Sequence, residues 1–294
     1  MSKVKGERMK LQTIVDIKPS KWKIGYEDKI LMLGSCFSDE IGEQMKQRYL
    51  SVTCNPFGTL YNPLSISNAI NAKISKCENE KIPLVEHEGL WHSMAHHGSF
   101  SRATKEEAER AIRASIETMQ QALEESTVVI VTFGTAWVYE MNGEIVGNCH
   151  KLPADRFTRR RLTVEEIVAA WRPILERYPD KHWLFTVSPI RHIKDGLHEN
   201  QLSKATLLMA VEQLSSLEGR SGGGLYFPSY EIMLDELRDY RFYADDLVHP
   251  SSLAVTYIWE RFVDTFCTPQ TRNELILQHK RWKHEHHIPL HSYE

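Results

Sequence analysis

The stretch KILMLGSCFSDE, residues 29–40, decides the fold of this chain. Its first five residues form a compact apolar run, which is typical of a buried β-strand. A glycine and two residues with nucleophilic side chains, Ser35 and Cys36, follow, and the acidic residues after them are typical of a helix N-terminus. A buried strand that turns directly into a helix is the opening unit of an α/β fold.

The same alternation continues along the chain. Compact apolar or aromatic runs predict buried central strands at residues 127–133, 182–187 and 224–227. Capping boxes begin predicted helices at Thr104 and Thr163. The helices are expected at residues 38–49, 63–75, 104–124, 163–177, 201–217 and 251–267. Strands that alternate with helices predict a mostly parallel sheet covered on both faces, a three-layer α/β/α sandwich.

Several segments depart from this alternation. Asn142-Gly143 between apolar flanks predicts an inserted hairpin over residues 138–146. The His-rich residues 91–100 are expected to form a loop, with His87, His92, His96 and His97 at the surface rather than at a metal. Arg159-Arg160-Arg161 is interpreted as a solvated helix entry, residues 221–224 as a surface turn and residues 269–294 as a peripheral tail.

Composition limits the classes of function. The chain has 294 residues, 41 % of them hydrophobic, and a formal net charge of −3, so one domain over residues 1–294 and no nucleic-acid or membrane partner are expected. The sequence shows neither a signal-peptide core nor an apolar run of membrane-spanning length. Five cysteines, an odd number, favour free thiols in a reducing compartment. We therefore expect a cytoplasmic protein without a metal or other cofactor.

The turn at Ser35 and Cys36 is the first candidate for chemistry. Ligands of open α/β sheets bind beyond the carboxyl ends of the strands. At a helix N-terminus the free N–H groups favour a thiolate, lower its pKa and can hold an oxyanion. The alternative is a plain strand-to-helix turn, with a serine cap and a half-buried cysteine.

A second candidate, about 210 residues later, is the pair Asp246 and His249 just before a predicted helix. A spacing of three residues lets the carboxylate orient the imidazole, as in a nucleophile, base and acid triad. An Asp-x-x-His pair can equally be a helix cap beside a surface histidine. Its significance depends on its occurring together with the turn at Cys36.

These residues resemble a known family. GSCFS at residues 34–38 resembles the signature of the GSCFA family, which is similar in layout to the SGNH/GDSL hydrolase superfamily. Four further blocks support the resemblance, and it covers about residues 29–266. They are residues 55–59, 132–137, 148–151 and 187–192.

The resemblance implies a flavodoxin-like core and an oxyanion hole. It assigns oxyanion donors to Gly58 and Gly134. Ala136 stands where the superfamily has a side-chain amide, so Thr135 or Asn148 is the candidate for a third donor. Losing such a donor costs about 3 kcal/mol of transition-state stabilisation elsewhere.

The nucleophile has two possible assignments. Aligning the superfamily turn Gly-Asp-Ser-Leu on Gly34 without a gap places Cys36 at the nucleophile, whereas a slip of one residue places Ser35 there. We favour Cys36, because a thiol depends less on its base. Arg191 and His192 follow a strand and are candidates for orienting the substrate.

The resemblance therefore implies a carboxylic ester hydrolase that removes a small acyl group, for example from a glycan. In this hypothesis Cys36 or Ser35 is acylated, His249 acts as base and then acid, and Asp246 orients His249. The alternatives are an acyltransferase that acylates a sugar or small alcohol and a ligand-binding module that has lost catalysis.

Overall fold

The computed structural model describes residues 12–73, 82–216 and 224–286. At its centre lies a sheet of five parallel strands in the order β10-β9-β5-β1-β2. Their bounds are β1 Lys29–Gly34, β2 Ser51–Cys54, β5 Val128–Phe133, β9 His182–Val187 and β10 Leu225–Phe227. When the five strands are numbered 1 to 5 along the chain and the sheet is read from β2 to β10, the order is 2-1-3-4-5, the flavodoxin-like arrangement.

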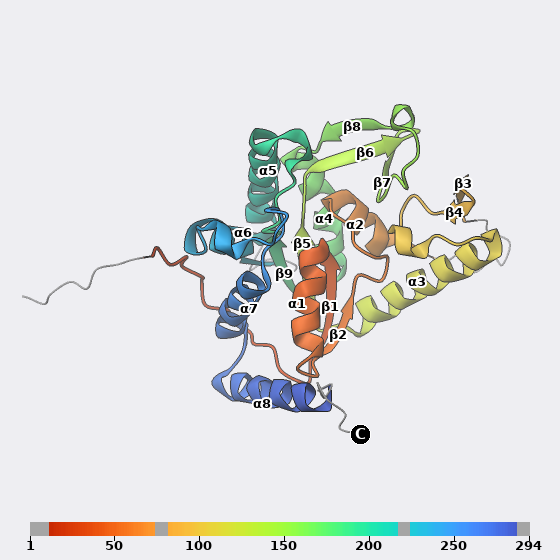
Figure 1. Cartoon of the computed structure of the whole chain (residues 1–294). Coiled ribbons are helices and arrows are strands. Elements are labelled where there is room, and N and C mark those ends of the chain that lie inside the picture. The colour runs from red at the N-terminus through yellow and green to blue at the C-terminus, as the bar shows by residue number, and fades with distance from the viewer. Residues whose placement is uncertain (1–11, 74–81, 217–223, 287–294) are drawn as a thin grey trace, which may run out of the picture.

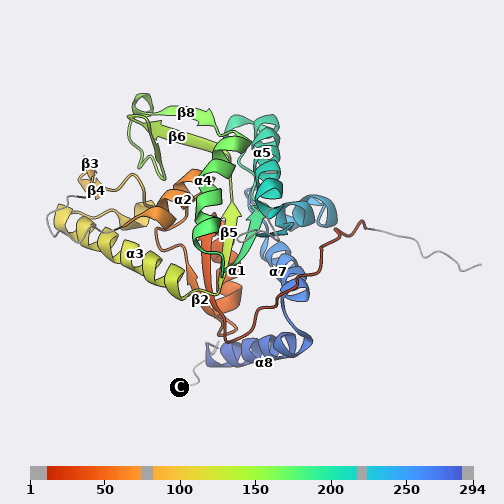
Figure 2. The same cartoon turned by 180° about the vertical axis from the view of Figure 1, so that it is seen from behind.

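Helices cover both faces of this sheet (Figures 1 and 2). Successive residues of a strand point to opposite faces, so Leu31 and Leu33 of β1 belong to one core and Ile30 and Met32 to the other. The first core joins the sheet to four helices, α2 Pro63–Asn71, α3 Lys105–Glu125, α4 Val164–Arg177 and α5 Leu197–Ser215. The second joins it to α1 Cys36–Lys46 and α7 Ser252–Phe266. The predicted three-layer α/β/α sandwich is confirmed.

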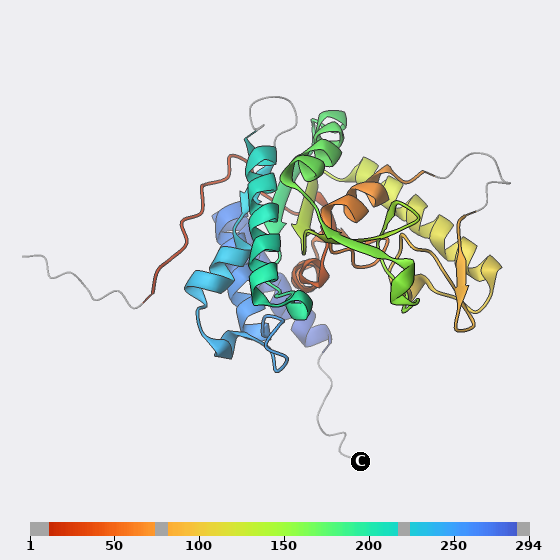
Figure 3. The same ribbon diagram turned by 90° about the horizontal axis from the view of Figure 1, so that it is seen from above.

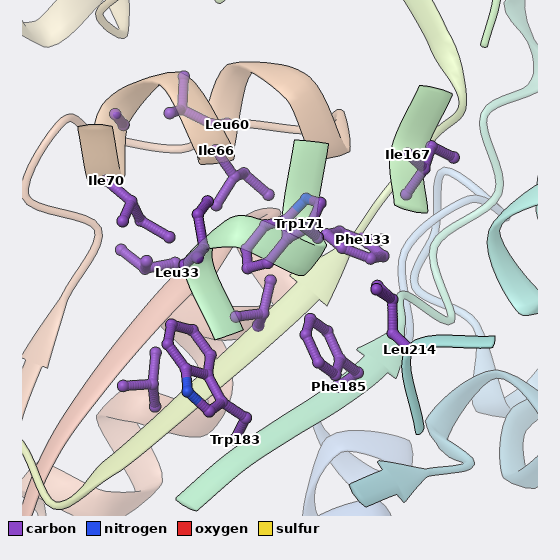
Figure 4. Packing of buried hydrophobic residues seen from close by; sticks show 14 of the residues in the cluster. Leu33, Leu60, Ile66, Ile70, Phe133, Ile167, Trp171, Trp183, Phe185 and Leu214 are labelled. Atoms are coloured by element: carbon purple, nitrogen blue, oxygen red, sulfur yellow. The ribbon is translucent and has the colours of Figure 1, made fainter. Parts of the chain in front are cut away.

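The first core is rich in aromatic side chains. Trp171 of α4 packs edge-on against Phe133, Trp183 and Phe185 of the sheet, at ring distances of 5.2, 6.2 and 5.4 Å (Figure 4). Its indole nitrogen donates a hydrogen bond to the Pro63 carbonyl. Edge-to-face packing of this kind adds about 0.5–1.5 kcal/mol per pair to the burial itself.

Three of the four predicted strands are central, as expected. The fourth, β10, forms the edge of the sheet, so its interpretation as a central strand was wrong. The opposite edge, β2, was missed because its four residues SVTC are partly exposed and lack a continuous apolar run.

The predicted helices are present with small shifts at their ends. Thr104 and Thr163 are the N-caps of α3 and α4, and the capping box at Thr163 is reciprocal. Shorter helical segments are η1 Gly98–Phe100, η2 Ala154–Arg156, η3 Ile193–Asp195, α6 Ser229–Glu231, η4 Ile232–Glu236 and η5 Tyr240–Phe242.

A small antiparallel sheet lies at the carboxyl ends of the central strands, at the top of Figure 1. It contains the predicted hairpin, β6 Trp137–Met141 with β7 Glu144–Val146, and a third strand, β8 Thr158–Arg161. The arginine run therefore forms a strand and not a helix entry. Its side chains are neutralised in place, because Arg159, Arg160 and Arg161 each pair with a carboxylate.

The His-rich segment begins in a second hairpin, β3 Val85–His87 with β4 Leu90–His92, which extends beside α3 (Figure 3). The expectation of surface histidines was wrong for His92 and His96, which are 7 % and 2 % exposed. His96 stacks on Phe57 at 4.1 Å, and its two ring nitrogens lie 2.8 Å from Ser93 Oγ and 2.9 Å from Ser115 Oγ. Neighbouring hydroxyls satisfy this imidazole, which allows its burial.

The described part of the C-terminal tail is a helix, α8 Pro269–Glu285, with Leu275 buried against the second core. It lies at the end of the sheet opposite to the small sheet (Figure 1). Residues 287–294 and most of the predicted turn at 221–224 lie outside the described residues. Among the described helices, none has the length and apolar character needed to cross a bilayer.

Candidate active site

The residues at the β1–α1 turn lie where the strand order reverses, between β1 and β5. This switch point is the usual ligand site of an open α/β sheet. Gly34 has φ +134°, and a Cβ added there would lie 2.1 Å from the Thr132 carbonyl oxygen of β5. The turn thus requires glycine, and the close approach fixes Ser35 and Cys36 against the end of β5.

Cys36 and the Asp246–His249 pair meet in space. The Cys36 Sγ lies 3.7 Å from His249 Nε2, and His249 Nδ1 lies 2.6 Å from an Asp246 carboxylate oxygen. The other Asp246 oxygen accepts the backbone N–H groups of Val248 and His249, both at 2.9 Å. The structure therefore brings together three predicted site residues in the order thiol, imidazole and carboxylate.

Electrostatics set the tautomer of His249. The two backbone N–H groups and the imidazole lower the pKa of Asp246 to about 2, so its carboxylate is ionised at neutral pH. An ionised partner at Nδ1 requires a hydrogen there, which leaves Nε2 of the neutral ring as an acceptor facing Cys36. The imidazole is thus arranged to take the thiol proton.

The thiol itself is not preformed as a thiolate. Burial raises the pKa of Cys36, and Asp39 and Glu40 raise it further, whereas the N–H groups of Cys36 and Phe37 lower it. The effect of desolvation on the thiol pKa is larger than the effect of those N–H groups. The expectation that the helix N-terminus would lower the pKa of Cys36 was therefore wrong. At rest the Cys36 thiol therefore holds its proton.

Ser35 occupies a different position. It is the N-cap of α1, its side chain is fully buried, and its Oγ has no hydrogen-bond partner among the described residues. Only Cys36 of the two lines the cavity next to His249. The geometry therefore favours the alignment that places Cys36 at the nucleophile.

The amides expected to be oxyanion donors are engaged elsewhere. The Gly58 N–H donates to the Asn55 carbonyl at 2.7 Å, and the N–H groups of Gly134 and Thr135 donate to the Tyr61 carbonyl at 2.8 and 2.9 Å. The Thr135 hydroxyl lies 3.1 Å from Ser203 Oγ. The N–H groups of Cys36 and Phe37, in the first turn of α1, are available instead, since first-turn amides have no acceptor within their own helix.

Asn148, Arg191 and His192 all line the cavity in front of Cys36. His192 Nε2 is buried without a partner among the described residues, and a Cβ on Gly134 would lie 3.3 Å from it. Burial first, and then Lys204 and His249, lower the pKa of His192 to about 3, so its ring stays neutral.

Arg191 supports the loop that carries His249. Its backbone N–H donates to the Val248 carbonyl at 3.2 Å, and its guanidinium donates to the Leu247 carbonyl. The guanidinium also lies 4.3 Å from the centre of the Tyr243 ring. These contacts position the loop that carries His249.

Two residues near the site were not predicted. Tyr61 lines the cavity, and burial together with Cys36 and Asp39 raises its pKa. Lys204 of α5 is fully buried, and its Nζ donates at 2.7 Å to the carbonyls of Gly134 and Ser188, at the ends of β5 and β9. The available signal for Lys204 was its helical spacing from Leu207 and Val211, which places this lysine on the buried face of α5.

The described residues contain no group of three or more His, Cys, Asp or Glu side chains placed to hold a metal ion. The chemistry that these side chains offer is that of a nucleophile with its own base.

Fold and site together define an α/β/α sandwich with a thiol, imidazole and carboxylate at its topological switch point. The model of the GSCFA family matches residues 29–262, and the chain belongs to this family. A search of curated proteins found no match.

Proposed function

We propose that the protein is a carboxylic ester hydrolase that works through an acyl-thioester on Cys36. The observation that carries the proposal is the continuous contact from Cys36 Sγ through His249 to Asp246, at 3.7 and 2.6 Å. A nucleophile hydrogen-bonded to a base that a third group orients is the general pattern of covalent acyl transfer. The resemblance to SGNH/GDSL hydrolases, as an analogy of layout, points to the same reaction class.

In the first half of the reaction, Cys36 Sγ attacks the ester carbonyl carbon while its proton passes to His249 Nε2. The tetrahedral intermediate collapses, the C–O bond breaks, and His249 returns the proton to the departing alcohol. Water then attacks the thioester and gives a proton to His249. The C–S bond breaks, the acid leaves, and the proton returns to Cys36.

The oxyanion in this proposal accepts the N–H groups of Cys36 and Phe37 at the start of α1. His192 supplies a third donor from its Nε2, which has no hydrogen-bond partner in the described part of the chain, and this requires the tautomer protonated there. It would replace the side-chain amide that the superfamily places at the position of Ala136. Ala136 is fully buried, and its N–H donates to Ser203 Oγ.

The test is the intact mass of the protein after brief exposure to an activated acetyl ester. Wild type should gain one acetyl group, mapped by peptide analysis to Cys36, and Cys36→Ala and His249→Ala should not. Cys149→Ala is the matched control, since Cys149 lines the same cavity but has no imidazole partner among the described residues, and it should acylate normally.

Other outcomes separate the alternatives. An adduct that moves to Ser35 would return the nucleophile to the serine, and transfer of the acetyl group to an added sugar would identify an acyltransferase. A folded protein that gains no adduct would contradict the proposal and favour a binding module.

A further inference from the structure

The cavity in front of Cys36 carries an excess of positive charge. It encloses about 550 Å³, and three cations, Arg159, Arg191 and Lys194, line it against one carboxylate, Asp195. The whole chain carries a net charge of −3, so this concentration of cations is local. Low-dielectric walls focus such a field on whatever occupies the cavity.

The wall of the cavity beyond Cys36 is built around Arg159. Its guanidinium lies 4.8 Å from the Trp137 ring and 5.0 Å from the Tyr139 ring, and it pairs with Asp195. The single carboxylate of the lining is therefore already neutralised, and Arg159 is held in place by two aromatic rings.

The other two cations lack such a partner. Lys194 donates at 2.8 Å to the Tyr139 hydroxyl, and Arg191 donates to the Leu247 carbonyl. Neither forms an ion pair within the described ranges 12–73, 82–216 and 224–286. Their charges are available to an anion in the cavity.

Three nitrogen atoms of the lining residues need acceptors. Trp137 Nε1, Arg159 Nε and Arg191 Nε are buried and have no hydrogen-bond partner among the described residues. All three groups can only donate. Because no acceptor of the described residues faces them, these three donors add to the positive electrostatic potential at the lining.

We infer that the ester accepted at Cys36 carries a negatively charged group, tested below as a carboxylate, which lies toward Lys194 and Arg191. That the ligand is an ester rests on the proposed function. The preference for an anion follows from the residues that line the cavity alone. It predicts that anionic reagents reach Cys36 more readily than neutral reagents of the same size.

Alkylation tests the preference without any hydrolysis. Iodoacetate and iodoacetamide react with the same thiolate, but only iodoacetate carries a negative charge. The rate of Cys36 alkylation by iodoacetate divided by the rate with iodoacetamide therefore reports the electrostatic potential at the thiol. Peptide mapping assigns the rates to Cys36, with Cys36→Ala as the blank. At low salt the ratio should exceed that of a free thiol, and Lys194→Met should lower it by about threefold to tenfold.

Lys105→Met is the matched control, because Lys105 also lies over an aromatic ring, Trp91, at 5.6 Å, but outside the cavity. It should leave the ratio unchanged. A wild-type ratio at or below that of the free thiol, or an equal drop in both variants, would overturn the inference.

A matched pair of esters separates this inference from the proposed function. The aryl monoester of adipic acid, whose carboxylate is too far along the chain to attack its own ester readily, should release its aryl alcohol faster than the same compound with its free acid methylated. Each rate is taken above the uncatalysed rate of the same ester, and Lys194→Met should reduce the difference. Equal hydrolysis of both would refute the anionic preference and keep the hydrolase. Hydrolysis of neither would refute the hydrolase, and the alkylation ratio would still decide the inference.

Discussion

The buried His96 predicts an acid-sensitive fold. Burial, and to a smaller extent the nearby His150, lowers the pKa of His96 from 6.5 to about 4. The unfolded chain therefore binds more protons than the folded one between these pH values, and folding stability is lost as the pH falls from 6.5 towards 4. The difference of about 2.5 pKa units corresponds to about 3 kcal/mol at 1.36 kcal/mol per unit.

The perturbation is His96→Gln, which keeps a polar side chain between Ser93 and Ser115 but cannot gain a proton. It should cost stability at pH 7, because the stacking on Phe57 is lost. Urea denaturation at several pH values from 7 to 4 should show the wild type losing about 3 kcal/mol more than the variant over this range.

The contribution of His96 is the difference between wild type and His96→Gln in how steeply the free energy of unfolding falls with pH. Other titrating groups, such as His150, are present in both proteins and cancel in this difference. His198→Gln, on an exposed position of α5, is the control and should follow the wild type. Parallel stability curves for wild type and His96→Gln would refute the reasoning, because they would show that burial does not hold this imidazole neutral.

Three further predictions follow from the site. Asp246→Asn removes the ionised partner that fixes the tautomer of His249, so the rate of ester hydrolysis should fall by roughly a hundredfold or more. The melting temperature should change little, because the Asp246 side chain is half exposed. The rate of Cys36 alkylation by iodoacetamide should rise with pH to a midpoint above that of an ordinary thiol, because burial raises its pKa, and a midpoint below it would mean that the helix N-terminus prevails. Gly34→Ala should destabilise the fold by about 2–4 kcal/mol in chemical denaturation, because its Cβ would lie 2.1 Å from the Thr132 carbonyl oxygen, and wild-type stability would contradict the required close approach.

The sequence allowed the β1–α1 turn and the Asp246–His249 pair to be found, because each is a local pattern with its own chemistry. Their meeting in space depended on the parallel order of the strands, which the alternation of strands and helices predicts. The edge strand β2 and the arginine-rich β8 were missed, because partners elsewhere in the chain, and not local hydrophobicity, make them strands.

The environment of the site was less predictable. The thiol pKa depends on how deeply Cys36 is buried, and the engagement of the Gly58 and Gly134 amides depends on two particular carbonyls. Lys204 reaches the strand ends from a helix about 70 residues beyond Gly134. The helix-face position of Lys204 indicates burial, but no local pattern in the sequence indicates which distant carbonyls its side chain contacts.

The distance along the chain between Cys36 and its imidazole has a consequence during synthesis. The two residues are 213 positions apart, and at roughly 5–20 residues per second the ribosome needs roughly 10–40 seconds to add the second after the first. Throughout that interval the nascent chain holds the thiol without its base. Cys36 and His249 therefore meet only when the last crossover has been translated and α7 has packed beside α1, so a chain interrupted before that point carries Cys36 without its imidazole partner.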